Sequence, residues 1–136
     1  MINVDSDNLQ KLYIAYFGRP SDPSGLNYWL SVSKKSLTLR EISNQLSIQD
    51  EYTNYMRDKS IESKINKLYL NVFNHEADSE SLNYWLSMVD SENLTISDIV
   101  YKLIDFENQT NLINLAVTDQ DINVLKNKLL AAELFT

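Results

Sequence analysis

The segment LYIAYFGRPSDPSGLNYWLS, residues 12–31, returns at residues 68–87 as LYLNVFNHEADSESLNYWLS, with ten of twenty positions identical at a spacing of 56. After one inserted residue a weaker match follows, between LTLREISNQL (37–46) and LTISDIVYKL (94–103). Self-similarity at a fixed spacing is typical of a repeated structural unit. The chain is therefore predicted to contain two copies of one unit of about 45 residues.

The apolar residues of both copies follow helical spacing rather than the alternation of strands. In the first helix of each copy they recur every three or four positions and form one apolar face. These residues are Leu9, Leu12, Tyr13, Tyr16 and Phe17 in copy one and Ile65, Leu68, Tyr69, Val72 and Phe73 in copy two. A chain with only two Gly and two Pro also lacks the turn density of a sandwich of short strands.

Polar residues predict where the remaining helices begin. Asp22 and Asp78 are expected to cap the helices that carry LNYWLS, because an Asp carboxylate accepts hydrogen bonds from the open amides of a first turn. A third helix is predicted after Ser36 and after Asn93, and residues 50–56 are expected to add a short helix. Their buried rows are expected to be Leu39, Ile42 and Leu46 in copy one and Ile96, Ile99 and Leu103 in copy two.

The last helix is predicted at 118–134, where Thr118 and Asp121 resemble a capping box. Its apolar face would be Ile122, Leu125, Leu129 and Leu130. We therefore predict an all-α fold, a single helical bundle over 1–136. It would consist of two tandem copies of a three-helix unit (repeat unit one 9–56, repeat unit two 60–113) and a closing C-terminal helix.

Composition limits the classes of function. Nineteen acidic residues against twelve basic ones give a net charge of −7, which opposes binding to nucleic acid. The chain has no cysteine, and its only histidine, His75, lies in a loop and is expected to be an ordinary surface residue. No nucleophile–base pair or glycine-rich phosphate loop is present, so we expect no enzyme. We also expect no transmembrane segment, because no apolar stretch approaches the roughly 20 residues that a bilayer requires.

Calcium needs only clustered oxygens, so the acidic pairs Asp5/Asp7 and Asp119/Asp121 are candidate calcium ligands. Both pairs lie where an acidic residue favours the N-terminus of a helix, and the structural role is preferred. No cofactor is assigned with certainty, and Ca²⁺ is kept as a candidate.

The doubled LNYWLS divides into two faces when it is followed around a helix at about 100° per residue. Leu26, Trp29 and Leu30 fall on one side, so both tryptophans are predicted to be core anchors. The other side carries Asn27, Tyr28 and Ser31, and copy two repeats them as Asn83, Tyr84 and Ser87. These residues either pack against neighbouring elements or present two polar-aromatic surfaces to a carbohydrate or a protein. The candidate ligand-binding residues are Arg19, Asp22, Asn27, Tyr28, Ser31, Asn83 and Tyr84.

The phrase LYIAYFGRPSDPSGLNYWL resembles the signature of the domain-of-unknown-function family 4214, with Leu-Tyr, Gly-Arg, Asp-Pro-x-Gly-Leu and Tyr-Trp in order. Copy two lacks the Gly-Arg and the Pro and Gly after its Asp. The resemblance implies an all-helical module of large bacterial surface and secreted proteins, including S-layer and calcium-binding repeat proteins. In similar S-layer proteins the amino-terminal helical region binds lipopolysaccharide, and a chain that begins directly with the module suits that place.

The resemblance thus implies a non-catalytic N-terminal anchoring domain, extracellular on the bacterial cell surface. The expected partner is cell-surface polysaccharide or lipopolysaccharide, with possible self-association in a lattice. Because a charge of −7 opposes anionic cores, we expect the neutral O-chain as the ligand, with Ca²⁺ as a helper. The alternative is a structural protein–protein interaction module within a lattice or beside an enzyme domain.

Overall fold

The computed structural model describes residues 4–33, 37–105 and 117–134. Within these ranges the chain forms eight helices and no strands, so the prediction of an all-α fold is confirmed. The helices are α1 (Ser6–Phe17), α2 (Pro23–Ser33), α3 (Leu39–Ser47), α4 (Asp50–Tyr55), α5 (Ile61–Phe73), α6 (Ser79–Glu92), α7 (Ile96–Ile104) and α9 (Asp119–Glu133). The end of the proposed second repeat unit, 106–113, lies outside the described residues.

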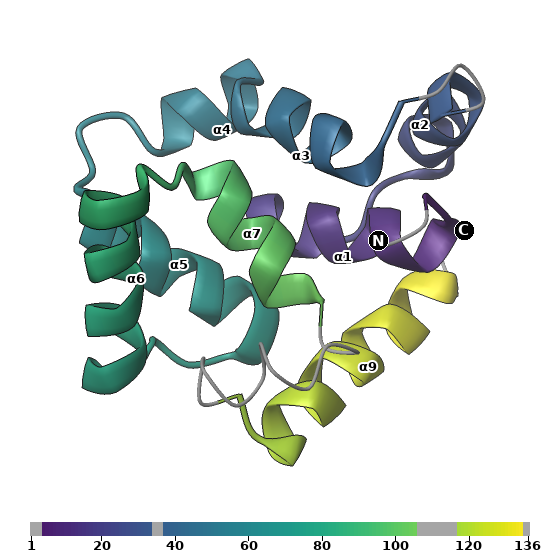
Figure 1. Ribbon diagram of the computed structural model, residues 1–136. Helices are drawn as coiled ribbons and strands as arrows, with labels where there is room; N and C mark the ends of the chain where they lie inside the picture. Colours follow the sequence, from purple (N-terminus) through teal and green to yellow (C-terminus); the bar gives the residue numbers. More distant parts are fainter. Residues whose placement is uncertain (1–3, 34–36, 106–116, 135–136) are drawn as a thin grey trace.

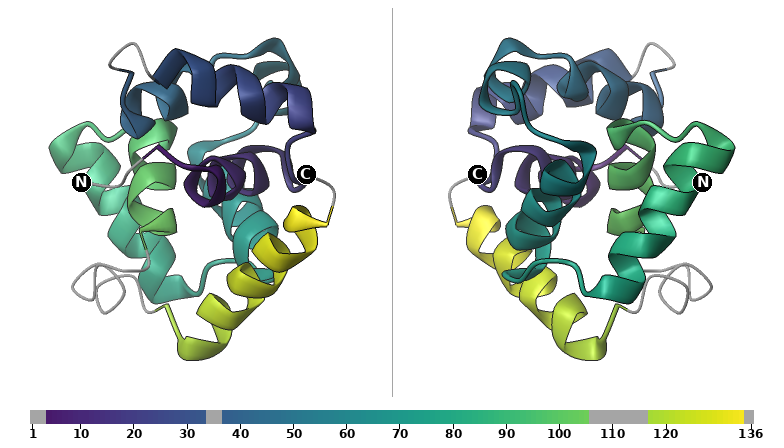
Figure 2. Two further views of the ribbon diagram at one scale, coloured as in Figure 1. Left: turned by 90° about the vertical axis from the view of Figure 1, so that its right-hand side faces the viewer. Right: turned by 90° about the vertical axis from the view of Figure 1, so that its left-hand side faces the viewer.

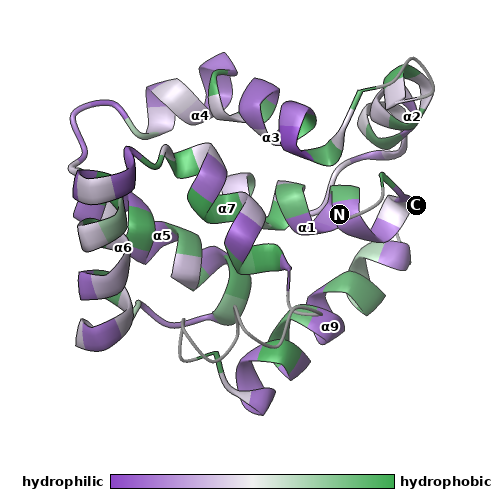
Figure 3. Cartoon of the chain, viewed as in Figure 1, coloured by the Kyte–Doolittle hydropathy of each residue, from purple (hydrophilic) through white to green (hydrophobic). Residues whose placement is uncertain are grey.

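Three helices, α1, α5 and α7, form the centre of the molecule (Figure 1). Helix α3 packs against α7 and α1, and α9 packs against α5 and α1. Helices α2 and α6, which carry the two LNYWLS segments, lie at opposite ends of the molecule (Figures 1 and 2). Hydrophobic residues are concentrated along the central α5 and α7, whereas α6 is mostly hydrophilic (Figure 3). One core therefore joins residues from both copies.

The same tyrosine–tryptophan hydrogen bond occurs in both copies. Trp29 Nε1 donates to Tyr13 Oη at 2.7 Å, and Trp85 Nε1 donates to Tyr69 Oη at 2.9 Å. The tryptophans are 4 % and 0 % exposed, which confirms that they are core residues. Because a buried indole N–H needs an acceptor, the Tyr of the preceding helix explains why each copy pairs its Trp with a Tyr sixteen residues upstream.

A second contact, which holds the loop before each LNYWLS helix, also recurs at a spacing of 56. Gln10 Oε1 accepts a hydrogen bond from the Ser21 amide at 2.7 Å, and Asn66 Oδ1 accepts one from the Ala77 amide at 3.2 Å. An amide side chain on the first helix thus satisfies a loop N–H that secondary structure does not. The loops are fixed by these bonds although their own sequences differ.

Polar side chains are buried where the two halves of the chain meet. Asn71 Nδ2 donates to the Ala15 carbonyl at 3.0 Å, between α5 and α1. On the other side of α1, the Tyr16 hydroxyl lies 2.8 Å from Ser43 Oγ, and Ser97 Oγ donates to Ser43 Oγ at 3.2 Å. Burial raises the pKa of Tyr16 to about 12. These hydrogen bonds connect α1 with α3, α5 and α7, and they give the central packing a defined register.

The predicted caps are present, with one correction. Asp22 Oδ1 accepts a hydrogen bond from the Gly25 amide at 2.7 Å, and Asp78 Oδ1 accepts one from the Ser81 amide at 2.8 Å. The third helices were expected directly after Ser36 and Asn93, but α3 and α7 begin two residues later. Their N-caps are the threonines of two capping boxes, Thr38 with Glu41 and Thr95 with Asp98, in which each Thr hydroxyl and acidic side chain bind the other's amide.

Helix α9 begins with the expected capping box of Thr118 and Asp121. Leu125 and Leu129 are buried in its contact with the core, but the prediction was wrong for Leu130, which is exposed. The side chain of Lys128 donates to the Asn71 carbonyl in the last turn of α5 at 2.5 Å. A cation at that position also offsets the negative end of the α5 dipole, so α9 is held by charge as well as by apolar packing.

Candidate functional site

A hollow of about 330 Å³ lies between the end of α1, helix α4 and the side of α5. We call it the aromatic hollow, because four of its eight lining residues are aromatic. It is lined by Tyr16, Phe17, Arg19, Glu51, Tyr52, Tyr55, Lys67 and Asn71. Concave sites with aromatic walls and a few polar groups are the usual form of small-ligand sites.

Helix α1 ends at a glycine with a left-handed backbone conformation, and the residues that follow it form part of the edge of the hollow. Gly18 has φ of 71°, and its amide donates to the Ile14 carbonyl at 2.9 Å. A Cβ at this position would lie 2.8 Å from Asn71 Oδ1 on α5. The backbone angle and the close approach of the Asn71 side chain both favour glycine at this position, whereas Asn74 adopts the same left-handed angle at the corresponding position of copy two. The turn places the next residue, Arg19, beside α4.

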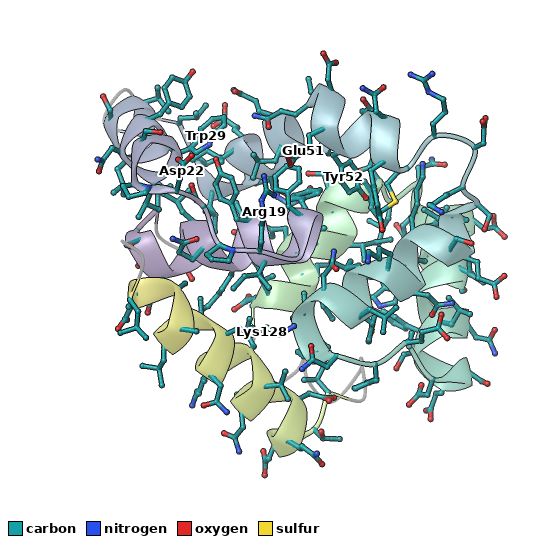
Figure 4. All side chains as sticks on the ribbon, turned by 180° about the vertical axis from the view of Figure 1, so that it is seen from behind. Arg19, Asp22, Trp29, Glu51, Tyr52 and Lys128 are labelled. Atoms are coloured by element: carbon teal, nitrogen blue, oxygen red, sulfur yellow. The ribbon has the colours of Figure 1, made fainter. Side chains whose placement is uncertain are left out.

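Arg19 is held by two contacts. Its Nη2 lies 2.8 Å from Glu51 Oε1, and its guanidinium lies 5.4 Å from the centre of the Phe17 ring. Arg19, Glu51 and Tyr52 meet between α1 and α4 (Figure 4). Because both charged side chains are more than half exposed, the ion pair adds little to stability. Its effect is to orient a guanidinium and a carboxylate at the mouth of the hollow.

Tyr52 supplies the hollow with a hydroxyl group that is not used by the fold. The residue is 6 % exposed, and its ring meets Tyr16 edge-on with the ring centres 5.0 Å apart. Burial raises its pKa far above the ordinary value, so the hydroxyl is neutral. In the part of the chain that the structure describes, this hydroxyl has no hydrogen-bond partner. Solvent reaches the hydroxyl, since among the described residues only Gln10 Nε2 is a fully buried side-chain polar atom without a partner. A ligand oxygen can therefore bond to the Tyr52 hydroxyl in exchange for water.

Tyr55 forms the outer wall of the hollow. Its ring is 54 % exposed, which is unusual for a large aromatic side chain next to a core. Two ammonium groups approach this ring, Lys67 Nζ at 5.5 Å and Lys59 Nζ at 6.0 Å from its centre. The wall therefore combines an open aromatic face with positive charge.

Two of the predicted site residues, Arg19 and Asp22, line a second hollow of about 330 Å³ beside α2. Asp22 Oδ1 also accepts a hydrogen bond from Ser24 Oγ at 3.0 Å. The bond from the Gly25 amide is the main reason that the pKa of Asp22 lies below its ordinary value, followed by the bond from Ser24. Asp22 is thus occupied in capping α2, whereas Arg19 contributes to both hollows.

The predicted residues of the doubled motif lie elsewhere. Asn27, Tyr28 and Ser31 are exposed on the outer face of α2, and none of them lines the aromatic hollow. Tyr28 is 57 % exposed. On α6, Asn83 is exposed but Tyr84 is half-buried against Trp85. Since α2 and α6 lie at opposite ends of the molecule (Figures 1 and 2), the two surfaces do not form one site.

The sequence interpretation missed Tyr52, Tyr55 and Lys67. It predicted a short helix at 50–56 but assigned no ligand-binding role to its aromatic residues. The available signal was the pair Tyr52 and Tyr55, three residues apart on one side of that helix, with Glu51 beside them as an ion-pair partner for a basic residue.

His75 takes the place in copy two that Arg19 takes in copy one, 56 residues earlier. Its ring stacks on Phe73, Nε2 lies 2.7 Å from Asp121 Oδ1, and Nδ1 lies 2.7 Å from the Glu76 carbonyl. Both neighbours can only accept, so both ring nitrogens donate when the imidazole is protonated. His75 is therefore more than a surface residue: it fastens the loop of copy two to the buried cap of α9.

These contacts predict a pH-dependent contribution to stability. The bonds to Glu76 and Asp121 raise the pKa of His75 above its ordinary 6.5, with a further charge effect from Asp78. A raised pKa means that the stabilisation is complete below pH 6.5 and is lost as pH rises through the folded-state pKa. We expect the melting temperature of the wild type to exceed that of His75→Gln most near pH 5.5, and the gap to shrink by pH 8.5.

Because His75 is the only histidine, the variant removes all imidazole titration from the chain. Thermal unfolding followed by circular dichroism at several pH values measures the gap. A gap that does not change with pH would contradict the role of the charged imidazole.

Neither a metal cluster nor a membrane span is found where the structure is described. Among residues 4–33, 37–105 and 117–134, no group of three or more His, Asp or Glu residues is placed to hold a metal ion. Asp5 caps α1 by accepting the Asn8 amide at 2.8 Å, and Asp121 caps α9. No helix within the same ranges is both long and apolar enough to cross a membrane.

Comparison of the chain with family models, with curated proteins and with solved structures gives no match. The resemblance to family 4214 therefore stays an expectation that rests on the motif residues.

Proposed function

We propose that this chain is a non-catalytic anchoring domain of a bacterial surface-layer or secreted protein, and that it binds cell-surface polysaccharide. The observation that supports this most is the aromatic hollow, where the hydroxyl of Tyr52, which has no partner among the described residues, lies beside the exposed ring of Tyr55. A sugar ring has an apolar face and a rim of hydroxyls. Such a ligand can stack on one tyrosine and accept or donate a hydrogen bond at the other.

The guanidinium of Arg19 and the carboxylate of Glu51 would add hydrogen bonds to the hydroxyl groups of the sugar. A carboxylate accepts from sugar hydroxyls and a guanidinium donates to ring and hydroxyl oxygens, so a fixed pair at the mouth selects the orientation of the ring. The proposal also includes a tandem duplication of a three-helix unit, which the hydrogen bonds that recur at a spacing of 56 support. Binding is assigned mainly to copy one, because His75 of copy two is engaged by α9.

The expected location is the extracellular face of the bacterial cell, and Ca²⁺ is proposed as a bridge to the polysaccharide rather than as a resident cofactor. Binding is measured with and without EDTA. Weaker binding in EDTA would show that Ca²⁺ takes part, and equal binding would show that it does not.

The test is retention of the purified chain on lipopolysaccharide and on bacterial polysaccharides, measured by affinity gel electrophoresis. Tyr55→Ala should weaken retention about tenfold, corresponding to about 1.4 kcal/mol, because the stacking surface is removed. Tyr28→Ala is the matched control, since it removes an equally exposed tyrosine outside the hollow. Absence of retention on every polysaccharide would refute the proposed function.

A second candidate is the protein–protein interaction module, which is favoured by the exposed Asn27, Tyr28 and Ser31 on α2. If that surface is the functional one, Tyr28→Ala and not Tyr55→Ala will change binding, either to glycan or to other copies of the chain. Sedimentation velocity at increasing concentration distinguishes self-association from glycan binding.

A further inference from the structure

The aromatic hollow continues into a second depression along α5. A hollow of about 210 Å³ shares Tyr55 and Lys67 with it and is also lined by Lys59, Ser63, Asn66 and Glu76. The two depressions thus lie on either side of one tyrosine and one lysine. We call them together the Tyr55 groove. A groove with two depressions suits two successive units of a chain-like ligand better than one isolated small molecule.

The cations of the groove differ in how they are used. Arg19 is paired with Glu51. Lys59 and Lys67 have no carboxylate within ion-pair distance among the described residues, and both ammonium groups point at the ring of Tyr55. The other carboxylate of the groove is Glu76. Two ammonium groups therefore lie beside one exposed ring, with a single unpaired carboxylate in the groove and no direct ion pair to either lysine within the described ranges.

The sign of the charge in the groove is opposite to that of the net charge of the whole chain. The charged residues that line the two depressions are three basic ones, Arg19, Lys59 and Lys67, and two acidic ones, Glu51 and Glu76, although the net charge of the chain is −7. An anionic polymer would be repelled by most of the surface and would be drawn to the part where the local sign is reversed. The net charge led us to expect a neutral O-chain, whereas the local charge favours an acidic ligand.

We propose that the Tyr55 groove binds an acidic polysaccharide, with a uronic-acid-like sugar stacked on Tyr55 and its carboxylate at Lys67. The neighbouring sugar would lie in the depression lined by Lys59 and Asn66. This inference rests on the proposed polysaccharide binding and narrows it to one substrate class. A neutral chain could still stack on the ring, but it would leave both ammonium groups without a partner.

The experiment compares acidic polysaccharides with their own neutral forms. Polygalacturonate, alginate and hyaluronate are each presented beside a carboxyl-reduced preparation, which keeps the polymer chain and removes its charge. We expect at least one acidic polymer to be bound about tenfold more tightly than its reduced form. The affinity should also fall as salt rises, because the contact is electrostatic.

Lys67→Gln tests the assigned cation, and Lys64→Gln is its matched control, which removes the same charge from α5 outside both depressions. We expect Lys67→Gln to weaken binding of the acidic polymer about tenfold and Lys64→Gln to change it less than about twofold. The melting temperature of both variants is measured to show that the fold is intact. Equal losses in the two variants would overturn the location of the site.

The remaining outcomes separate this inference from the proposed function. Equal binding of acidic and reduced polymers overturns the acidic ligand but leaves polysaccharide binding in place. If none of the three acidic polymers is retained while a neutral bacterial polysaccharide is, the acidic ligand is again overturned. Failure of every polysaccharide overturns both.

Discussion

Replacing Trp29 with Ala is expected to lower the free energy of unfolding by about 3–5 kcal/mol, because a large buried side chain leaves a cavity that its neighbours fill only in part. The indole is 4 % exposed and its N–H is bonded to Tyr13. A domain of this size has a total stability of only about 5–15 kcal/mol, so the variant should be close to unfolding at 37 °C. Urea denaturation followed by fluorescence of the remaining Trp85 measures the loss.

Tyr28→Ala is the control for this prediction, since Tyr28 is the adjacent residue on the same helix and is 57 % exposed. It should change the free energy of unfolding by less than about 1 kcal/mol, as exposed substitutions usually do. Similar losses for the two variants would mean that the division of LNYWLS into a buried and an exposed face is wrong.

Replacing Gly25 with Ser is expected to destabilise the chain by about 1–3 kcal/mol through overpacking. A Cβ on Gly25 would lie 2.8 Å from Ser21 Oγ and 3.2 Å from both Asp22 Oδ1 and Tyr13 Oη. Copy two has the reverse combination at the corresponding positions, with Ser81 in place of Gly25 and Ala77 in place of Ser21. At these two positions each copy thus carries one serine hydroxyl and not two.

The comparison of copies predicts that Ser21→Ala will rescue Gly25→Ser. The double variant should recover most of the lost stability, with a coupling energy of about 0.5–3 kcal/mol between the two sites. Ser31→Ala together with Gly25→Ser is the matched control, because it removes a serine hydroxyl from the exposed outer face of the same helix, away from the atoms nearest to the added Cβ. If Gly25→Ser and the double variant are equally stable, the contact between the two serines does not cause the loss of stability.

Much of the fold could be predicted from local spacing. The apolar residues of α1 and α5 recur at helical intervals, and Asp22, Asp78 and Thr118 stand directly before their helices, so both kinds of signal lie within a few residues of chain. The starts of α3 and α7 were misplaced by two residues, because Ser36 and Asn93 are good caps in isolation. The capping boxes that form instead need the acidic partners Glu41 and Asp98 as well.

The candidate site could not be predicted in the same way. The aromatic hollow forms where Arg19, Glu51 and Lys67 meet, and these residues belong to three separate helices or their ends. Local spacing describes each helix by itself and does not describe how α4 lies against the turn at Gly18. Net charge is limited for a related reason, since a sum over the chain does not show the local excess of basic residues in the groove, on which the proposal of an acidic ligand depends.

The hydrogen bond between Asn71 and Ala15 joins the two halves of the chain where α5 crosses α1. The two positions are 56 residues apart, so the contact joins corresponding residues of the two copies, with a buried alanine on one side and an amide side chain on the other. A half paired with an identical half would place alanine against alanine, or asparagine against asparagine. The first arrangement would lose this hydrogen bond, and the second would place another amide side chain where the crossing now has a methyl group. At this crossing the two halves are therefore complementary rather than interchangeable.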